Sequence, residues 1–363
     1  MQIRSINYIN FRNLKNNKLE FNSKFNLFLG KNGQGKTSIL EAIYFSITGK
    51  SFRTKHIKEI IKYGNLNSGA MIEYTDKISS KSIGVKFDQK TRQYFFNKNK
   101  IKFDEFIGRI NVISFIPDDI YLILGNPSLR RSFFDYEISQ ANEIYYRNLR
   151  DFDKILKVRN KFLKEGKFKD PLFDVYNEKF VDLSVKIIVK RYEYIKKMSV
   201  LLNLNYRKLF SSDSELKIVY KTFKDISLKD ENYVKEEFLK ELNNVKNHEK
   251  YRGVTMIGPQ KDDFLFYLNN KDAKAYSSQG EKKSIIFSLK VAEIDMFIKE
   301  KGDYPIFLID DISSYFDSIR KESIINYFKN RDIQIFLSST DDLGIESMNF
   351  YINEGDVIEP TNS

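Results

Sequence analysis

The feature that most constrains this chain is a glycine-rich octapeptide between an apolar run at residues 25–29 and an amphipathic stretch closed by Gly49. The octapeptide fits the pattern G-x-x-x-x-G-K-[ST] and consists of Gly30, Lys31, Asn32, Gly33, Gln34, Gly35, Lys36 and Thr37. In a strand–loop–helix unit, such glycines let backbone N–H groups surround phosphates, and the helix N-terminus favours negative charge. An ordinary glycine-rich turn is the alternative, and the strand and helix on either side disfavour it.

The loop predicts a role for each of its reactive side chains. We expect Lys36 to reach the β- and γ-phosphates of ATP and the Thr37 hydroxyl to ligate Mg²⁺. The expected nucleotide-binding residues are the whole octapeptide and Ser38, which follows it.

The second feature is acidic and lies far downstream of the loop. The apolar run at residues 306–309 ends in Asp310 and Asp311, the Walker B arrangement of a buried strand that delivers carboxylates to one end. Asp310 is expected to hold Mg²⁺, and Asp311 stands where a base or water-positioning carboxylate belongs. Two adjacent acids could instead cap the next helix. Together with the loop they predict an ATPase site with Lys36, Asp310 and Asp311 as catalytic residues, and Thr37 and Asp310 as metal ligands.

A third segment separates the nucleotide-binding classes. The catalytic-loop pattern of protein kinases is absent, and so is a convincing base-reading motif of the simple GTPases. About 30 residues before the acidic strand and just before a helical stretch, the chain reads Ser277, Ser278, Gln279, Gly280 and Glu281. This segment resembles the signature motif of ABC-type ATPases, with Ser278 and Gly280 at its Ser and second Gly positions. In that class the signature of one subunit caps the γ-phosphate bound by another, whereas a plain helix N-cap is the alternative.

The chain also resembles the bacterial RecF family of recombination-repair proteins nearly from end to end. The matching blocks are Phe11-Arg12-Asn13, the loop itself, Leu40-Glu41-Ala42-Ile43, Gly49-Lys50-Ser51-Phe52-Arg53, Pro117-Asp118-Asp119, Gly125-x-Pro127 with Arg130-Arg131 and Phe134-Asp135, and Gly258-Pro259-Gln260-Lys261-Asp262-Asp263. The chain departs from the usual motifs at Glu281, at Lys261 and in the segment 313–317.

The periodicity predicts an α/β protein: an ABC-type P-loop ATPase head interrupted by a helical insertion. Residues 1–127 and 251–363 alternate between strand and helix patterns, and residues 128–250 have the helical period. Two apolar stripes, beginning near residues 134 and 176, predict two long antiparallel helices of roughly 30 to 35 residues each. The last expected strand is 334–337.

Composition adds weaker constraints. The formal charge of +12 favours polyanionic partners such as nucleic acid or an anionic membrane surface, although a Lys- and Asn-rich chain of this kind weakens the inference. Without cysteine there is no disulfide or thiolate chemistry, and His56 and His248 form no metal pair or catalytic triad. With no signal peptide or membrane-length apolar run, we expect a cytoplasmic protein.

The resemblance implies an ATP-dependent homodimer that grips duplex or gapped DNA, releases it on hydrolysis, and acts with RecO and RecR to load RecA. Other readings remain open: a transporter ATPase subunit, a defence or chromosome-maintenance ATPase, or a DNA-binding module with a merely structural nucleotide. Candidate DNA contacts are Lys86, Lys90, Arg92, Lys98, Lys100 and Lys102, interleaved with Tyr94, Phe95 and Phe96, and Arg130, Arg131, Arg147 and Arg150. The alternatives are a solvated strand edge for the first stretch and structural pairing with nearby acids for Arg130 and Arg131.

Overall fold

The structure, a computed structural model, describes residues 1–76, 79–224 and 230–359. The chain forms two compact units. The first combines residues 1–119 and 293–363, and the second comprises residues 120–292. The domain boundaries predicted at 127/128 and 250/251 stay a prediction. The second compact unit, residues 120–292, is longer at both ends than the predicted insertion at residues 128–250.

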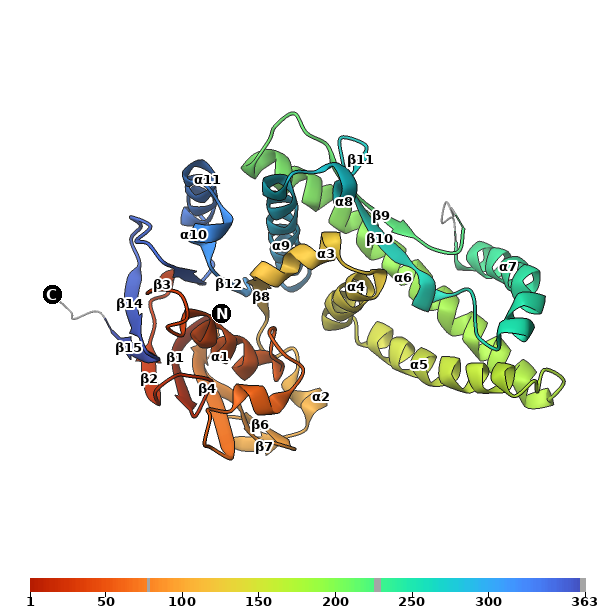
Figure 1. The fold of residues 1–363 in the computed structure, drawn as a ribbon, viewed down its shortest axis with the longest axis horizontal. Helices are drawn as coiled ribbons and strands as arrows, with labels where there is room; N and C mark the ends of the chain where they lie inside the picture. The colour runs from red at the N-terminus through yellow and green to blue at the C-terminus, as the bar shows by residue number, and fades with distance from the viewer. Residues whose placement is uncertain (77–78, 225–229, 360–363) are drawn as a thin grey trace. The chain divides into compact units, whose positions relative to one another are not determined.

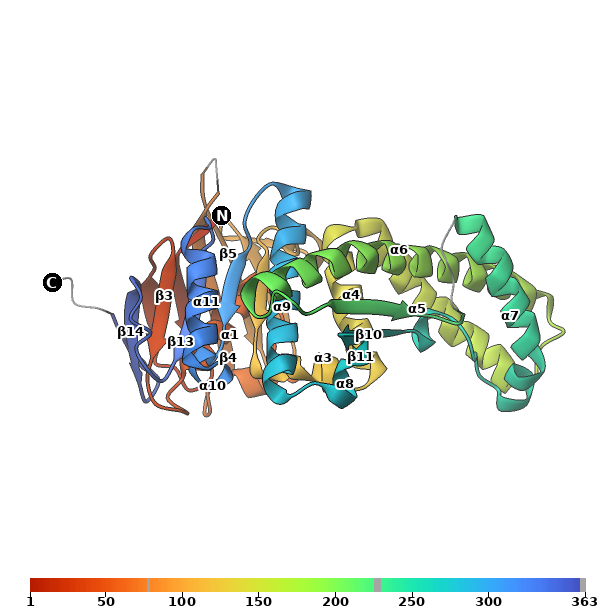
Figure 2. The same ribbon diagram turned by 90° about the horizontal axis from the view of Figure 1, so that it is seen from above.

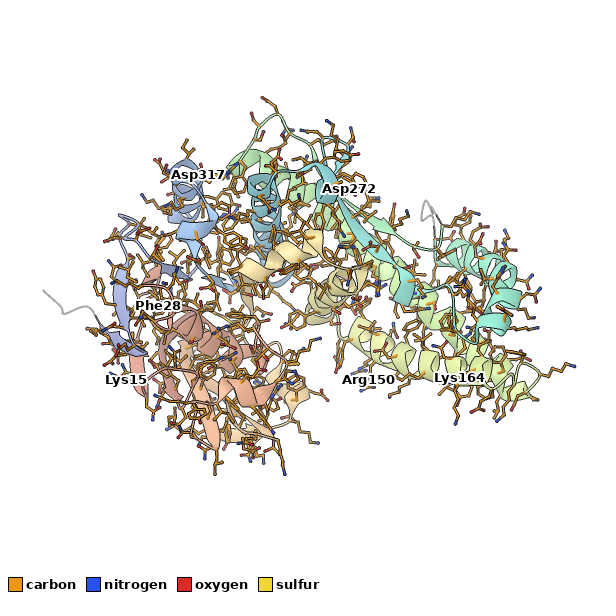
Figure 3. The ribbon with its side chains drawn as sticks, viewed as in Figure 1. Lys15, Phe28, Arg150, Lys164, Asp272 and Asp317 are labelled. Atoms are coloured by element: carbon orange, nitrogen blue, oxygen red, sulfur yellow. The ribbon has the colours of Figure 1, made fainter. Side chains whose placement is uncertain are left out.

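The first unit contains a mainly parallel sheet (Figure 1). In spatial order its strands are β15 (Asp356–Ile358), β14 (Met348–Asn353), β3 (Phe25–Leu29), β13 (Ile335–Ser339), β12 (Ile306–Ile309) and β8 (Val112–Phe115). Only β15 runs antiparallel to its neighbour. Every residue of β3, β13 and β12 is buried, which fits their largely apolar sequences; the polar exceptions are Asn26 in β3 and Ser338 and Ser339 in β13. Figure 3 shows Phe28, on β3, among the side chains of this unit.

An antiparallel sheet completes the first unit. Its strands, in order, are β2 (Asn17–Glu20), β1 (Gln2–Ile9), β4 (Asn67–Thr75), β5 (Ser80–Asp88), β6 (Arg92–Phe96) and β7 (Asn99–Ile101). Helix α1 (Lys36–Thr48) packs against strands of both sheets, and one apolar cluster joins all three layers. Because it is covered on both sides, α1 is buried around most of its circumference. It ends where Gly49 adopts the left-handed conformation, as the sequence predicts.

Shorter elements close the first unit. They are the 3₁₀ helices η1 (Ile57–Ile60) and η2 (Pro117–Ile120), which ends one residue into the second unit, and the helices α2 (Phe103–Phe106), α10 (Ile312–Tyr315) and α11 (Ser318–Lys329). Asp317, labelled in Figure 3, caps α11 by accepting a hydrogen bond from the Arg320 amide. Strands β14 and β15 follow the expected last strand, so the prediction that the sheet ends at 334–337 was wrong. Their exposed alternate residues weaken the apolar signal.

The second unit is mostly helical (Figure 2). Its elements are α3 (Tyr121–Leu124), α4 (Pro127–Ala141), α5 (Glu143–Lys164), α6 (Pro171–Leu209), α7 (Glu231–Arg252), η3 (Pro259–Lys261), α8 (Ala273–Tyr276), the three-stranded sheet β11 (Lys271–Asp272), β10 (Asp263–Leu268) and β9 (Leu216–Lys221), and α9 (Gln279–Lys301), which continues into the first unit. Helices α5, α6 and α7 pack around one apolar cluster that includes Phe152, Phe180 and Phe238.

The prediction of two long helices was half right. The second is the single helix α6 of 39 residues, but the first is divided into α4 and α5. The break falls at Asn142, whose extended backbone and side-chain oxygen, bonded to the Tyr145 amide, start a new helix. The apolar stripe continues across the break and hides it. Among the described residues, no helix is long and apolar enough to cross a membrane.

Candidate active site

The glycine-rich loop connects β3 to α1 and has the backbone that its sequence predicts. Gly30, Gly33 and Gly35 all have positive φ angles. At Gly33 and Gly35 the φ angles of 80° and 123° favour glycine. A side chain at Gly30 would also collide with the Ile352 carbonyl oxygen, because a Cβ would lie 2.4 Å from it. The loop therefore requires glycine for its conformation and for the close approach of β14.

Lys36, Thr37 and Asp310 meet at the end of the parallel sheet. The Thr37 hydroxyl donates to the Asp310 carboxylate, with Oγ1–Oδ distances of 2.9 and 3.0 Å. The Lys36 ammonium donates to the carbonyl oxygens of Gly30 and Lys31, which hold it within the loop. Burial lowers the pKa of Lys36, and burial raises the pKa of Asp310 against the opposing hydrogen bonds from Ser338 and Thr37. Thr37 and Asp310, which are 273 positions apart in the chain, thus meet in the cavity that Lys36 also lines.

Asp311 has a strained position beside this centre. It is the N-cap of α10 with φ 56° and ψ 47°, a left-handed conformation that is uncommon for a residue with a side chain. Its amide donates to Ser338 Oγ at 2.7 Å, and Ser338 Oγ donates to Asp310 Oδ1 at 2.6 Å. Asp311 Oδ1 is buried and accepts no hydrogen bond from the residues described. A buried carboxylate oxygen in this state can take a proton or orient a water molecule.

The outer side of the loop is braced by residues from both ends of the chain. Asn13 accepts a hydrogen bond from the Ser38 hydroxyl at 3.0 Å and donates to the Gln34 carbonyl at 3.3 Å. The turn between β14 and β15 donates the amides of Glu354 and Gly355 to Gln34. Asn13 and the turn at residues 354–355 therefore support the loop through Gln34 and Ser38.

A buried carboxylate organises two arginines near the loop. Glu41, on the first turns of α1, is fully buried and forms a two-pronged ion pair with Arg12, with N–O distances of 2.7 and 2.8 Å. It also accepts a hydrogen bond from Ser51 and a longer contact of 3.4 Å from Arg53. The sequence motifs contained these residues, yet the pattern alone did not suggest that one carboxylate connects them.

These residues surround a cavity of about 840 Å³ within the first unit. Its lining residues are Arg12, Asn13, Asn32, Gly33, Gly35, Lys36, Thr37, Ser38, Arg53, Glu59, Ile61, Lys62, Tyr63, Pro117, Asp310, Asp311 and Ser338. Of the expected site residues, the loop glycines Gly33 and Gly35, Asn32, Lys36 to Ser38 and both aspartates come together here. Ser338 was missed, although its place at the end of an apolar strand beside β12 is a usable signal.

The signature-like residues lie in the second unit. Ser278 and Glu281 form a capping box at the start of α9: the Glu281 amide donates to Ser278 Oγ at 3.2 Å, and the Ser278 amide donates to Glu281 Oε2 at 2.6 Å. Gly280 lies in the first turn of α9 and has no side chain to cover the neighbouring amides. The capping box gives a physical reason for Glu281, the residue that departs from the usual Gln.

The basic residues proposed from sequence for DNA contact fall into two groups. Lys86, Lys90, Lys98, Lys100 and Lys102 are exposed on or beside β5–β7, whereas Arg92 is half-buried and donates to the Gly49 carbonyl oxygen at 3.0 Å. Arg130 is buried and pairs with Asp263, with N–O distances of 2.7 and 2.9 Å, and Arg131 donates to the Asp262 carbonyl oxygen at 2.8 Å. Arg130 and Arg131 therefore have structural partners within the second unit. Arg147 and Arg150 lie exposed on α5, where Figure 3 labels Arg150.

The donor set fits a nucleotide bound with Mg²⁺. A hydroxyl and a carboxylate converge as oxygen ligands, and Mg²⁺ sites use one or two carboxylates together with phosphates and water. Within the described residues there is no cluster of three or more His, Cys, Asp or Glu side chains that could hold a metal by themselves.

Comparison with known proteins shows to which broad class of proteins the chain belongs. The family model described as RecF/RecN/SMC N terminal domain matches residues 2–353. An Smc head bound to the C-winged helix domain of ScpA has the same fold, with a TM-score of 0.60 at 14% identity. The fold and the loop-and-aspartate site therefore define an ABC-type head of the RecF/RecN/SMC class.

Within that class the chain belongs to the RecF family. It is 36% identical over 367 residues to the DNA replication and repair protein RecF of Alkaliphilus oremlandii, covering 98% of this chain and all of that protein. The Listeria monocytogenes serotype 4b protein of the same name is 33% identical, with 98% and 99% covered. A solved structure described as the recombination mediator protein RecF-ATP in the RecFOR pathway has a TM-score of 0.89 at 29% identity, covering 99% of this chain and 98% of that one.

Proposed function

We propose that this chain is an ATP-driven DNA-binding protein of recombinational repair and replication. The observation that carries the proposal is the convergence of Lys36, Thr37 and Asp310 in one cavity, in a chain of the RecF family. The name of its relatives and the ATP-bound structure of a recombination mediator support it.

In this proposal the loop from Gly30 to Thr37 surrounds the phosphates, with its amides and the α1 N-terminus opposing their charge. Lys36 leaves its carbonyl partners and contacts the β- and γ-phosphates, while Thr37 and Asp310 hold the metal. A bound Mg²⁺ supplies charge neutralisation on the phosphate oxygens. Asp311 positions the attacking water, and its left-handed backbone aims the carboxylate.

A second copy of the chain completes the site. Ser278 and Gly280 at the N-terminus of α9 offer a hydroxyl and helix amides to the γ-phosphate bound by the partner copy. ATP thus supplies contacts that only the closed dimer makes, and it shifts the equilibrium towards that dimer. Hydrolysis removes those contacts and opens it. We expect turnover to be slow and stimulated by DNA.

The closed dimer grips duplex DNA at gaps and single-strand/double-strand junctions, and acts with RecO and RecR in loading RecA. The solved relatives are described as members of the RecFOR pathway. The charge of +12 suits binding through phosphates, with little sequence preference and strong salt dependence. The exposed lysines of β5–β7 and the arginines of α5 are candidate contacts.

The test is fluorescence anisotropy of a labelled gapped duplex at two salt concentrations with ATP-γ-S, ADP or no nucleotide. We expect tight binding only with ATP-γ-S, weaker at higher salt and lost in Lys36→Met. Equal binding in all nucleotide states would contradict the switch. Turnover by Asp311→Asn then separates an ATPase from a module with a structural nucleotide, since only the ATPase loses activity.

A further inference from the structure

A second cavity lies within the second unit and takes no part in the nucleotide chemistry described above. It encloses about 170 Å³ and is lined by residues of α5, α6, α7 and the loop that joins α5 to α6. Its walls are five apolar side chains: Leu163, Phe168, Phe173, Leu239 and Leu242. Sites for complete small molecules enclose roughly 300–1,000 Å³. This cavity, named the α5–α7 pocket, therefore suits a single apolar side chain rather than a complete ligand.

A buried ion pair forms the inner end of the α5–α7 pocket. Arg159 and Glu249 are each 2% exposed, and the N–O distance between them is 2.6 Å. Arg159 also donates to the side-chain oxygens of Asn177 at 3.0 Å and Thr255 at 2.6 Å. The second carboxylate oxygen of Glu249 accepts from the Met256 amide at 2.8 Å. Because both charges are satisfied inside the protein, the inner end offers a ligand a fixed wall and no free charge.

The mouth of the pocket is apolar and basic. Leu239 is 44% exposed, and Phe168 is half-buried, with the Lys250 ammonium 5.5 Å from the centre of its ring. Lys246 and Lys250 line the pocket, are exposed, and lie one helical turn apart on α7. Neither lysine has an ion pair among the residues that the structure describes. The pocket therefore opens beside two ammonium groups that are free to meet carboxylates.

The surface around the mouth has an excess of positive charge. Segments 161–179 and 243–254 carry six further exposed basic residues: Lys161, Lys164, Lys167, Lys169, Lys179 and Arg252. Outside the buried ion pair, the acids of the same segments are Glu165, Asp170, Asp174 and Glu178. Figure 3 labels Lys164, the last residue of α5 and the neighbour of the wall residue Leu163 in the chain. An acidic partner is therefore attracted to this surface.

The combination of an apolar hole and a basic mouth distinguishes between acidic partners. A nucleic acid would supply phosphates to the lysines but no side chain for the hole. Its bases bind proteins by stacking on open aromatic faces. Phe173 is buried, and Phe168 is half-buried with Lys250 beside its ring, so neither phenylalanine offers an open face. A peptide supplies both parts, since one apolar side chain can enter the hole while neighbouring carboxylates meet the ammonium groups.

We propose that the α5–α7 pocket docks an acidic segment of a partner protein. One apolar side chain of that segment enters the pocket, and carboxylates on either side of it pair with Lys246 and Lys250. The docking uses residues of the second unit alone and needs neither nucleotide nor DNA. Its success or failure is therefore separate from that of the proposed function.

Fluorescence anisotropy of a labelled peptide, Gly-Asp-Asp-Leu-Asp-Asp-Gly, titrated with the full chain tests this inference without nucleotide. We expect the same peptide with alanine in place of leucine to bind about tenfold more weakly, because the pocket then stays unfilled. Leu239→Ser, which removes an exposed wall of the pocket, should weaken binding of the leucine peptide in the same direction. A heptathymidylate probe, which has phosphates and no apolar side chain, should bind more weakly than the leucine peptide.

The basic mouth is tested by the double substitution of Lys246→Ala and Lys250→Ala, which should weaken binding of the leucine peptide about tenfold. The matched control is the double substitution of Lys196→Ala and Lys197→Ala. These lysines are also exposed, but they lie on α6 about 30 Å along the helix from the pocket residue Asn177. The control should bind the peptide as the unmodified protein does. Thermal melting of each variant checks that it is folded.

Three results would overturn the inference and leave the proposed function standing. The first is equal binding of the leucine and alanine peptides, which would mean that charge alone attracts them. The second is tighter binding of heptathymidylate than of the leucine peptide, lost with Lys246 and Lys250, which would make this surface a nucleic-acid contact. The third is no binding of the leucine peptide, or an equal loss in both lysine double variants.

Discussion

Glu41 is a buried carboxylate that binds two arginines in the first unit. The carboxylate is fully buried and meets Arg12 through two hydrogen bonds, while Arg53 and Ser51 contribute further donors. A buried ion pair of this kind loses much of its hydration, and removing one partner leaves the other charge uncompensated. Because Arg12 and Arg53 line the cavity, Glu41 also determines how two cations are held beside the phosphate loop.

Replacing Glu41 by alanine should lower the free energy of unfolding by about 3 kcal/mol or more, because Arg12 loses its carboxylate in a largely buried site. The matched control is Glu143→Ala. Glu143 pairs with Arg147 on the surface of α5, where loss of an ion pair costs less than about 1 kcal/mol. Urea unfolding of the three proteins measures both differences. Similar values for the two variants would contradict the buried role of Glu41.

Ser338 connects the two aspartates and has no catalytic chemistry of its own. Its hydroxyl donates to Asp310 and accepts from the Asp311 amide. Ser338→Ala should lower ATP turnover about tenfold, since a hydrogen bond to a charged group is worth roughly 1.5–3 kcal/mol. Ser323→Ala is the control and should keep full turnover, because Ser323 is exposed on α11 and its described hydrogen bond is to the Ile319 carbonyl. Unchanged turnover in Ser338→Ala would show that the aspartates are positioned without it.

At the scale of elements, Glu237 on α7 forms an ion pair with Lys224, which precedes that helix in the chain. Its carboxylate receives hydrogen bonds from Lys224 at 2.8 Å and Lys240 at 2.7 Å. These bonds lower the pKa of Glu237 to about 2. The unfolded carboxyl, with a pKa near 4.5, takes up its proton first on acidification. The stabilisation is therefore present above about pH 4.5 and is lost as the pH falls towards 2.

Thermal melting between pH 5 and pH 2.5 tests this dependence. Glu237→Gln cannot titrate, so its melting temperature should fall less over this interval than that of the unmodified protein. Glu236→Gln, an exposed neighbour on α7 without a described ion pair, should keep the original slope. If both variants follow the slope of the unmodified protein, Glu237 does not contribute to acid sensitivity.

On the scale of the whole molecule, each unit has its own apolar core, and the candidate phosphate site lies within the first. The first unit is assembled from residues 1–119 and 293–363, so loop and aspartates come from opposite ends of the chain. Ligand at 100 times its dissociation constant stabilises the state that binds it by about 2.7 kcal/mol.

Mg-tripolyphosphate should therefore slow amide exchange in β3, β12 and β13 of the first unit and leave α5 and α6 unchanged. Mass spectrometry of exchanged peptides measures both regions in one experiment. Lys36→Ala should show no slowing in either. Equal slowing in α5 and α6 would mean that phosphate binding is coupled to the second unit.

The sequence by itself determined the features whose physics is local. Four features could be predicted in this way: the phosphate loop, α1 with its end at Gly49, β3 and β12. Each depends on the backbone freedom of glycine, the helical period or an apolar run, and these are properties of residues adjacent in the sequence. Lys36, Thr37, Asp310 and Asp311 could be predicted as site residues for the same reason, because each belongs to a short sequence motif.

Tertiary structure decided what depends on distant partners. Strand β14 pairs with the distant strand β3, and β15 in turn pairs with β14, so both are recognisable as strands only in the folded sheet. The division of the first long helix at Asn142 is different, because it is a local capping event that a continuing apolar stripe hides. By contrast, the pairing of Glu41 with Arg12 and the hydrogen bonds of Ser338 to both aspartates require the folded chain. A buried charge or hydroxyl finds its partner by packing, and packing brings together residues that no sequence window contains.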